Sequence, residues 1–114
     1  MHHFTIGVEE EYQIIDVETR DLVSHVSKII EGGKATLQEN LKHEMHESVI
    51  EMETGICNNI QEVKAELTDL RKRLIKVAHE NNLRVSGGGT HPFSRWQDNQ
   101  ITKADRYDKI ISDL

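Results

Sequence analysis

The sequence predicts an α+β fold, because segments with strand-like and helix-like patterns alternate along its 114 residues. Residues 4–17 carry apolar side chains at alternate positions, as a half-buried strand does. Residues 58–82 instead carry apolar side chains at the spacing i, i+3, i+4 and i+7, which places one apolar stripe along a helix. A chain of this length fits a single domain.

The other predicted elements are shorter. Residues 22–31 have helical spacing, and Gly32-Gly33 predicts the end of that helix. Residues 41–54 show an interrupted alternation that is typical of a strand or a hairpin. Residues 83–86 predict a short strand before a loop, and the pattern becomes helical again from Lys103 onward.

The central predicted helix has capping residues at both ends, whereas the last predicted helix has no cap at its end. Asn58 or Asn59 can cap the start of the central helix, and Asn81-Asn82 marks its end. The last helix has an apolar stripe with little left to bury against, which predicts a homo-oligomer. Because the chain stops inside that helix, we expect the natural protein to continue. The stripe consists of Tyr107, Ile110, Ile111 and Leu114.

The composition argues against several partners. The net charge is −6, and no Lys/Arg cluster could follow a phosphate backbone, so we expect no nucleic acid. No apolar run approaches the roughly 20 residues that span a bilayer, and the N-terminus lacks a signal-peptide pattern. We therefore expect a cytoplasmic protein with no membrane partner. Cys57 is the only cysteine, and its apolar neighbours predict a buried, unreactive thiol.

Three consecutive glutamates on the first predicted strand are the first candidate site. On a strand, Glu9 and Glu11 project from one face and Glu10 from the other. Two carboxylates on one face repel each other unless a cation lies between them, and oxygen ligands suit Mg²⁺ or Mn²⁺. The alternative is a solvated edge strand whose acidic side chains bind nothing.

A second acidic group lies in the segment 41–54. Carboxylates beside apolar neighbours on a strand are costly unless they are paired or bound to a metal. The alternatives are a solvated surface and a zinc site, although the spacing matches no helical zinc motif such as H-E-x-x-H. The group comprises Glu44, Glu47, Glu51 and Glu53, with His43 and His46 between them.

A glycine-rich segment, Ser86-Gly87-Gly88-Gly89-Thr90-His91-Pro92-Phe93, is the third candidate. Three glycines allow the backbone to approach a ligand closely and to present N–H groups to an anion. The segment is neither a Walker A loop nor a dinucleotide fingerprint. A flexible connection is the alternative, but His91, Phe93 and Trp96 are unusual residues for a mere connection.

Taken together, four stretches resemble the glutamate–cysteine ligase 2 family of bacterial carboxylate–amine ligases. The Gly-Gly-Thr-His-Pro-Phe segment is the most specific, and the Gly-x-Glu-x-Glu strand is the next. The resemblance implies an antiparallel, glutamine-synthetase-like sheet with helices packed on one face, which forms a floor for ATP and metal. The four stretches are residues 4–12, 42–51, 86–93 with Trp96, and Arg106-Tyr107.

The resemblance also implies an activity and its residues. Family members phosphorylate a carboxylate with ATP and then form an amide, with glutamate and cysteine as substrates in glutamate–cysteine ligases. By the resemblance, Glu9 and Glu11 look like metal ligands for Mg²⁺ or Mn²⁺. Glu44 and Glu51 look like two further acids that face the metal or the substrate, although many relatives have Asp at position 44. The resemblance places Thr90 and His91 near the substrate, without a defined role.

Length is the main departure from the family, whose members are roughly three times as long. We therefore expect residues 1–114 to be one domain and the N-terminal fragment of a larger catalytic domain, inactive by itself. Two alternatives stay open. One is a stand-alone metal- or anion-binding or oligomerising module without catalysis, and the other is a plain structural domain.

Overall fold

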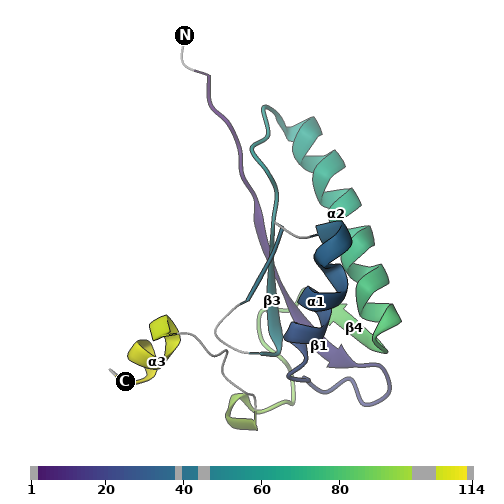
Figure 1. Cartoon of the computed structure of the whole chain (residues 1–114), viewed down its shortest axis with the longest axis vertical. Helices are drawn as coiled ribbons and strands as arrows, with labels where there is room; N and C mark the ends of the chain where they lie inside the picture. The colour runs from purple at the N-terminus through teal and green to yellow at the C-terminus, as the bar shows by residue number, and fades with distance from the viewer. Residues whose placement is uncertain (1–2, 38–39, 44–46, 99–104, 113–114) are drawn as a thin grey trace.

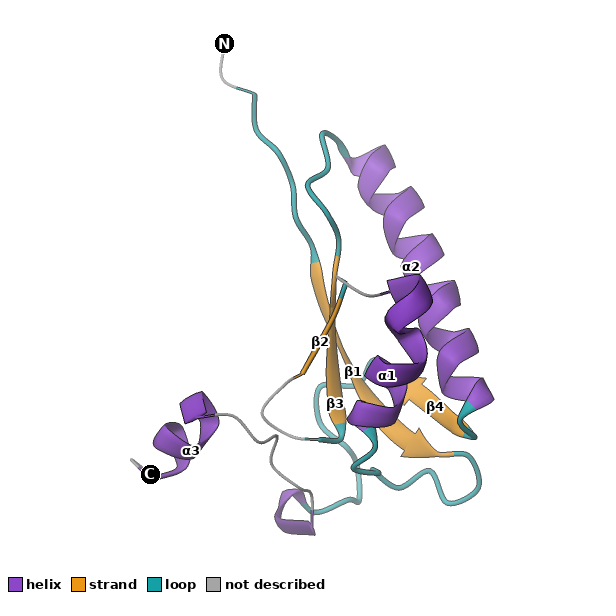
Figure 2. Cartoon of the chain, in the orientation of Figure 1, coloured by secondary structure: helices purple, strands orange, loops and turns teal. Residues whose placement is uncertain are grey.

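A computed structural model describes residues 3–37, 40–43, 47–98 and 105–112. The described residues form one four-stranded antiparallel sheet in the order β2-β3-β1-β4, with two helices against one of its faces (Figures 1 and 2). This confirms the predicted α+β class. The elements are β1 Glu9–Asp16, α1 Val26–Leu37, β2 Leu41–His43, β3 Val49–Glu53, α2 Ile60–Glu80, β4 Leu83–Ser86, a 3₁₀ turn Trp96–Asp98 and α3 Asp105–Ser112.

The first strand lies inside the sheet. Strand β1 pairs with β3 from Glu9 opposite Glu53 to Gln13 opposite Val49. Its second half pairs with β4, beginning with Gln13 opposite Ser86. The segment 41–54 contains the hairpin β2–β3, whose short first strand extends the sheet on the far side of β3. In the described sheet, the stretch of β1 that carries the glutamates therefore pairs with β3 alone, and β4 joins only from Gln13 onward.

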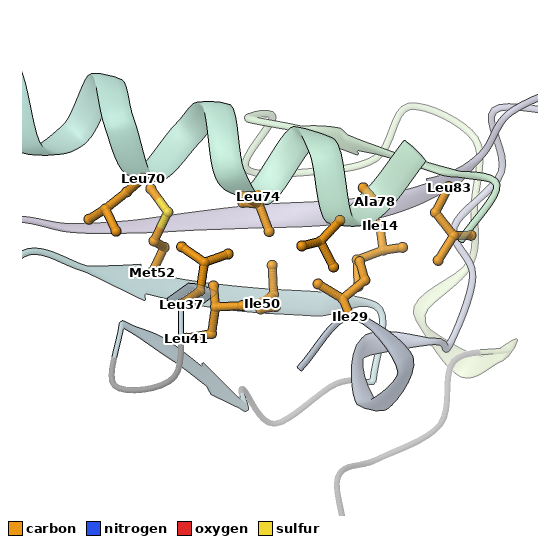
Figure 3. Packing of buried hydrophobic residues seen from close by; sticks show 11 residues of the cluster. Ile14, Ile29, Leu37, Leu41, Ile50, Met52, Leu70, Leu74, Ala78 and Leu83 are labelled. Carbon is orange, nitrogen blue, oxygen red and sulfur yellow. The ribbon is translucent and has the colours of Figure 1, made fainter. Parts of the chain in front are cut away.

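The core is aliphatic and lies between the sheet and the helices (Figure 3). Ile14 of β1 and Ile50 of β3 are fully buried, and Leu74 of α2 packs against the same cluster. Tyr12 is partly buried at its margin. The scarcity of aromatic residues is therefore compensated by branched aliphatic side chains. The cluster contains Ile14, Ile29, Leu37, Leu41, Ile50, Met52, Leu70, Leu74, Val77, Ala78 and Leu83.

Helix α2 begins and ends where its asparagines predict. The Asn59 side chain accepts a hydrogen bond of 2.9 Å from the backbone N–H of Glu62, which satisfies one of the free donors of the first turn. The backbone N–H of Asn81 donates to the Ala78 carbonyl at the other end. Asn82 follows with φ of 56°, a left-handed conformation that asparagine tolerates.

Helix α1 differs from its prediction. It begins at Val26 and runs through Gly32-Gly33 to Leu37, so the predicted start at residue 22 and the predicted end at the glycines are wrong. Ile29 and Leu37 are 0% and 1% exposed and lie about two turns apart on one face. Continuing the helix past the glycines therefore buries Leu37, and this tertiary gain outweighs the low helix propensity of glycine.

We expect Gly32→Ala to stabilise the protein by about 0.5–1 kcal/mol, because alanine favours the helix by about that amount. A Cβ on Gly32 would lie 3.4 Å from Val77 Cγ1 and Asn81 Nδ2, which is close to ordinary contact. Urea unfolding of both proteins measures the difference. A lower midpoint for the variant would mean that α1 and α2 need the closer approach that glycine allows.

The two ends of the chain also differ from the sequence pattern. Only residues from Glu9 onward join the sheet, although Ile6 forms an isolated bridge with Cys57. Ile110 and Ile111 of α3 are exposed. The Tyr107 side chain and Leu114 lie outside the described part, so the predicted stripe is seen only in part. None of the described helices is long and apolar enough to cross a membrane.

Candidate functional site

The face of the sheet opposite the helices carries the predicted acidic residues. Strand alternation turns Ile14 toward the helices and Glu9 and Glu11 toward the opposite face, which we call the open face. The register places Glu51 directly opposite Glu11 and Glu53 directly opposite Glu9. The predicted shared face of Glu9 and Glu11 is thus confirmed, and β3 adds two more carboxylates to it.

Three of these carboxylates converge. Glu9, Glu51 and Glu53 each offer one oxygen, and the three oxygens lie within 4.8 Å of one another. We call these three residues the carboxylate cluster. Glu11 is on the same face but outside this group, and Glu44 lies outside the described residues. The predicted ligand roles of all four residues, Glu9 and Glu51 included, stay predictions.

Sequence reasoning placed Glu53 in the second acidic group but not among the ligands. The signal was available, because Glu51 and Glu53 are two residues apart on a strand, as Glu9 and Glu11 are. What the sequence could not supply was the register. Only the pairing of Glu53 with Glu9 brings its carboxylate into the cluster.

Among the described residues, the basic side chain of Lys42 reaches this cluster. Lys42 of β2 lies opposite Glu51 in the register, and its Nζ is 2.6 Å from Glu53 Oε1. The hydrogen bond to Glu53 raises the pKa of Lys42, and the nearby charges of Glu51 and Glu9 act in the same direction. Lys42 thus places a positive charge beside the carboxylates of the cluster.

The donor set suits a small divalent cation. Mg²⁺ and Mn²⁺ prefer oxygen ligands, and at a metal–oxygen distance of about 2.1 Å the ligand oxygens of an octahedron lie roughly 3–4.2 Å apart. The oxygens of the carboxylate cluster need only a small rotamer change to reach that spacing. A shallow hollow adjoins the cluster, and it is lined by Gly7, Val8, Glu9, Glu53 and Thr54.

Glu10 points the other way and ties β1 to α2. Its carboxylate accepts a hydrogen bond of 3.0 Å from Arg71 Nε, and its other oxygen forms an ion pair with Arg71 Nη2. The Tyr12 hydroxyl donates to the same carboxylate. Hydrogen bonding to Arg71 lowers the pKa of Glu10, whereas burial and the neighbouring carboxylate raise the pKa of Tyr12. Glu10 is therefore a structural residue rather than a third ligand on the strand.

The lowered pKa of Glu10 predicts a pH-dependent stability. A carboxylate whose pKa is lower in the folded state stabilises the protein above its unfolded pKa of about 4.3, and this contribution is lost as the pH falls through the folded pKa. The difference in free energy of unfolding between the wild type and Glu10→Gln should therefore shrink as the pH falls from about 6 to about 3. Urea unfolding across that range measures it, and a constant difference would contradict the role of Arg71.

The glycine-rich segment folds back over the open face beside β4. Gly88 lies close to Gln13, because a Cβ on Gly88 would be 3.6 Å from Gln13 Oε1. Gln13 is on the same face as Glu9 and is 8% exposed. At about 3.3 Å per residue, the glycine turn lies roughly 13 Å along β1 from Glu9. The carboxylate cluster and the glycine turn therefore border the same surface from two sides.

His91 uses both ring nitrogens to hold this segment. Its Nδ1 accepts hydrogen bonds from the backbone N–H groups of Ser94 (3.1 Å) and Phe93 (3.3 Å). This leaves the proton on Nε2, which donates to the Arg20 carbonyl at 2.7 Å. The segment is thus tied to the turn after β1. Thr90 is exposed beside it, and the substrate-binding roles of Thr90 and His91 stay predictions.

Cys57 is buried, as its neighbours predict. It is 1% exposed, and its Sγ donates a hydrogen bond of 3.2 Å to Glu66 Oε2. Burial raises the pKa of the thiol, and the Glu66 carboxylate raises it further. A buried thiol with a raised pKa is a poor nucleophile. Cys57 is therefore not one of the reactive residues of the candidate site.

The chain is similar to one protein family over nearly its whole length. Residues 5–114 match the model of Glutamate-cysteine ligase family 2 (GCS2). A relative from Solibacter usitatus, named "Putative glutamate--cysteine ligase 2", is 50% identical over 111 residues. Relatives with the same name from Chloroflexus aurantiacus and Sorangium cellulosum are 44% and 45% identical over 111 and 113 residues.

The matches differ in how much of each protein they cover. They include 96% or 97% of this chain but only 29%, 28% and 30% of the three relatives, respectively. The chain therefore spans less than a third of the length of the curated relatives that it matches.

Proposed function

Because the chain belongs to Glutamate-cysteine ligase family 2, we propose that it forms the N-terminal part of an ATP-dependent carboxylate–amine ligase. The proposed reaction joins the γ-carboxyl group of glutamate to the amine of cysteine. The γ-carboxylate attacks the terminal phosphorus of ATP, ADP leaves, and the amine then displaces phosphate from the acyl-phosphate. The observation that carries this proposal is the convergence of Glu9, Glu51 and Glu53 on the open face.

The chain contributes a rigid acidic floor. Bound Mg²⁺ or Mn²⁺ would supply positive charge for the phosphates of ATP and for the transferred phosphoryl group. Glu9, Glu51 and Glu53 would hold the ion, and Glu11 lies next to them for a second one. The carboxylates sit on two paired strands, so the backbone ladder fixes their spacing before any ligand arrives.

The glycine segment would border the substrates from the other side. Gly87 to Gly89 allow close approach of a ligand to backbone N–H groups, and His91 holds the segment in place through its own backbone hydrogen bonds. Two basic side chains of the described sheet lie on the open face, Lys42 beside the cluster and Arg84 of β4. Arg84 is opposite Ile15, six residues along β1 from Glu9, and its Nη1 donates to the Leu83 carbonyl, so it does not reach the cluster. We therefore propose that the segment alone is inactive and that residues elsewhere in the longer ligase complete the site.

One observation favours a second candidate, a stand-alone metal-binding module without catalysis. The carboxylate cluster is assembled entirely within this chain, from two neighbouring strands. Such a module would bind Mn²⁺ but would leave ATP unchanged in every context, including a full-length protein that carries this segment.

Activity in a full-length protein that carries this segment decides between the two. The protein is incubated with Mg²⁺, ATP, glutamate and cysteine, and ADP is measured together with the mass of the amide product. We expect ADP and amide in equal amounts, and none from residues 1–114 alone. ATP turnover with a different acid or amine would support the ligase activity but show that its substrates differ from the proposed ones. No amide with any amino acid pair would overturn the ligase proposal.

A further inference from the structure

A cationic side chain, Lys42, lies beside the carboxylate cluster. Lys42 Nζ lies 2.6 Å from Glu53 Oε1, and Lys42 is the direct cross-strand neighbour of Glu51. Two of the three converging carboxylates thus adjoin one ammonium group. An oxygen that accepts this short, charge-assisted hydrogen bond offers one lone pair fewer to another cation.

We propose that Lys42 is a built-in counter-ion that occupies the cluster in the metal-free protein and competes with the divalent cation. This inference rests on the proposed metal site and adds a residue that sets its affinity. The Lys42 side chain is 54% exposed, so its four-carbon stem can swing into solvent when a divalent ion arrives. Binding then exchanges one monovalent charge for a divalent one.

The geometry explains why such a residue is useful. Glu9, Glu51 and Glu53 carry like charges on adjacent positions of two strands, and like charges directly opposite each other destabilise a sheet. An ammonium group among them reduces that repulsion until the metal binds. The same group lowers the apparent metal affinity, because its displacement must accompany binding.

Mn²⁺ titration of the whole chain tests the role of Lys42. Lys42→Met removes the charge and keeps most of the stem, and we expect it to bind Mn²⁺ about tenfold more tightly than the wild type. Lys42→Arg keeps a cation and should remain within about threefold of the wild type. Lys72→Met changes the net charge equally on the exposed face of α2 and should leave the affinity unchanged.

A second readout separates this role from an ordinary ion pair. If Lys42 only supports the fold, Lys42→Met lowers the melting temperature without metal and leaves the Mn²⁺ affinity unchanged, which overturns the proposal. If Lys42 is the counter-ion, the variant also gains more melting temperature from saturating Mn²⁺ than the wild type does. Equal tightening by Lys42→Met and Lys72→Met would overturn it as well, because net charge alone would then explain the effect.

The outcomes also distinguish this inference from the proposed function. If the wild type binds Mn²⁺, Glu51→Gln does not, and Lys42→Met binds like the wild type, only the role of Lys42 is overturned. If neither the wild type nor Lys42→Met binds Mn²⁺, the metal site itself is overturned, and the counter-ion role with it.

Discussion

Glu51→Gln is expected to weaken Mn²⁺ binding by about a hundredfold, the largest effect on ligand binding that we predict. Glu51 belongs to the carboxylate cluster and lies opposite Glu11 in the register, so it borders every acidic side chain of the open face on β1. An amide in its place keeps the shape of the side chain but removes the charge that the cation requires. Isothermal titration of Mn²⁺ into the chain measures the effect.

A control variant and a stability measurement accompany this titration. Glu80→Gln removes an equally charged, exposed side chain at the end of α2 and should change the affinity less than about twofold. The melting temperature of metal-free Glu51→Gln is measured as well, so that a loss of folding is not mistaken for a loss of binding. Equal binding by Glu51→Gln and the wild type would show that the cluster does not hold the ion.

Substitutions of Glu9 and Glu11 distinguish the carboxylate cluster from the rest of the open face. Glu9 belongs to the converging group and Glu11 does not. In the short chain, Glu9→Ala should therefore weaken Mn²⁺ binding far more than Glu11→Ala. In a full-length ligase the resemblance implies that both substitutions abolish activity while barely changing stability. Unchanged activity in both would contradict that assignment.

Local patterns were sufficient to predict the elements of the sheet and of helix α2. The alternation of residues 4–17 already placed Glu9 and Glu11 on one face, and the asparagines on either side of residues 60–80 marked the ends of the helix. These signals depend on neighbours within one turn or one pleat, so a single sequence carries them.

The features that the sequence could not predict depend on contacts between distant segments. Helix α1 continues through Gly32-Gly33 because Leu37 reaches the core. The residues next to the glycines do not indicate the stabilisation that burial of Leu37 provides. The cluster requires the β1–β3 register, which places Glu53 opposite Glu9. The pairing of Lys42 with Glu53 depends in turn on the β2–β3 hairpin. Register and packing are properties of the whole sheet, and no short window contains them.

Leu74→Ala should have the largest effect on stability, a loss of about 3 kcal/mol. Leu74 is fully buried and belongs to the core cluster that joins α2 to the sheet (Figure 3). Truncation removes its apolar contacts and leaves a cavity that the surrounding aliphatic side chains fill only in part. For a domain with a total stability of roughly 5–15 kcal/mol, such a loss is a large share.

Ile75→Ala is the matched control for this prediction. Ile75 is the next residue on the same helix but is 44% exposed, and alanine also favours the helix slightly. The control should therefore change the free energy of unfolding by less than about 1 kcal/mol. Urea unfolding of the three proteins gives the comparison, and similar losses for Leu74→Ala and Ile75→Ala would contradict the assignment of Leu74 to the core.

The same variant connects the core with the open face. Ile50 and Met52 point from β3 into the core, and Glu51 and Glu53 point from the same strand to the other face. The core thus fixes the backbone that positions the carboxylates. Under conditions where Leu74→Ala remains folded, its Mn²⁺ affinity should match that of the wild type, because the ladder between β1 and β3 is intact. A weaker affinity in the folded variant would show that α2 packing itself adjusts the spacing of the carboxylate cluster.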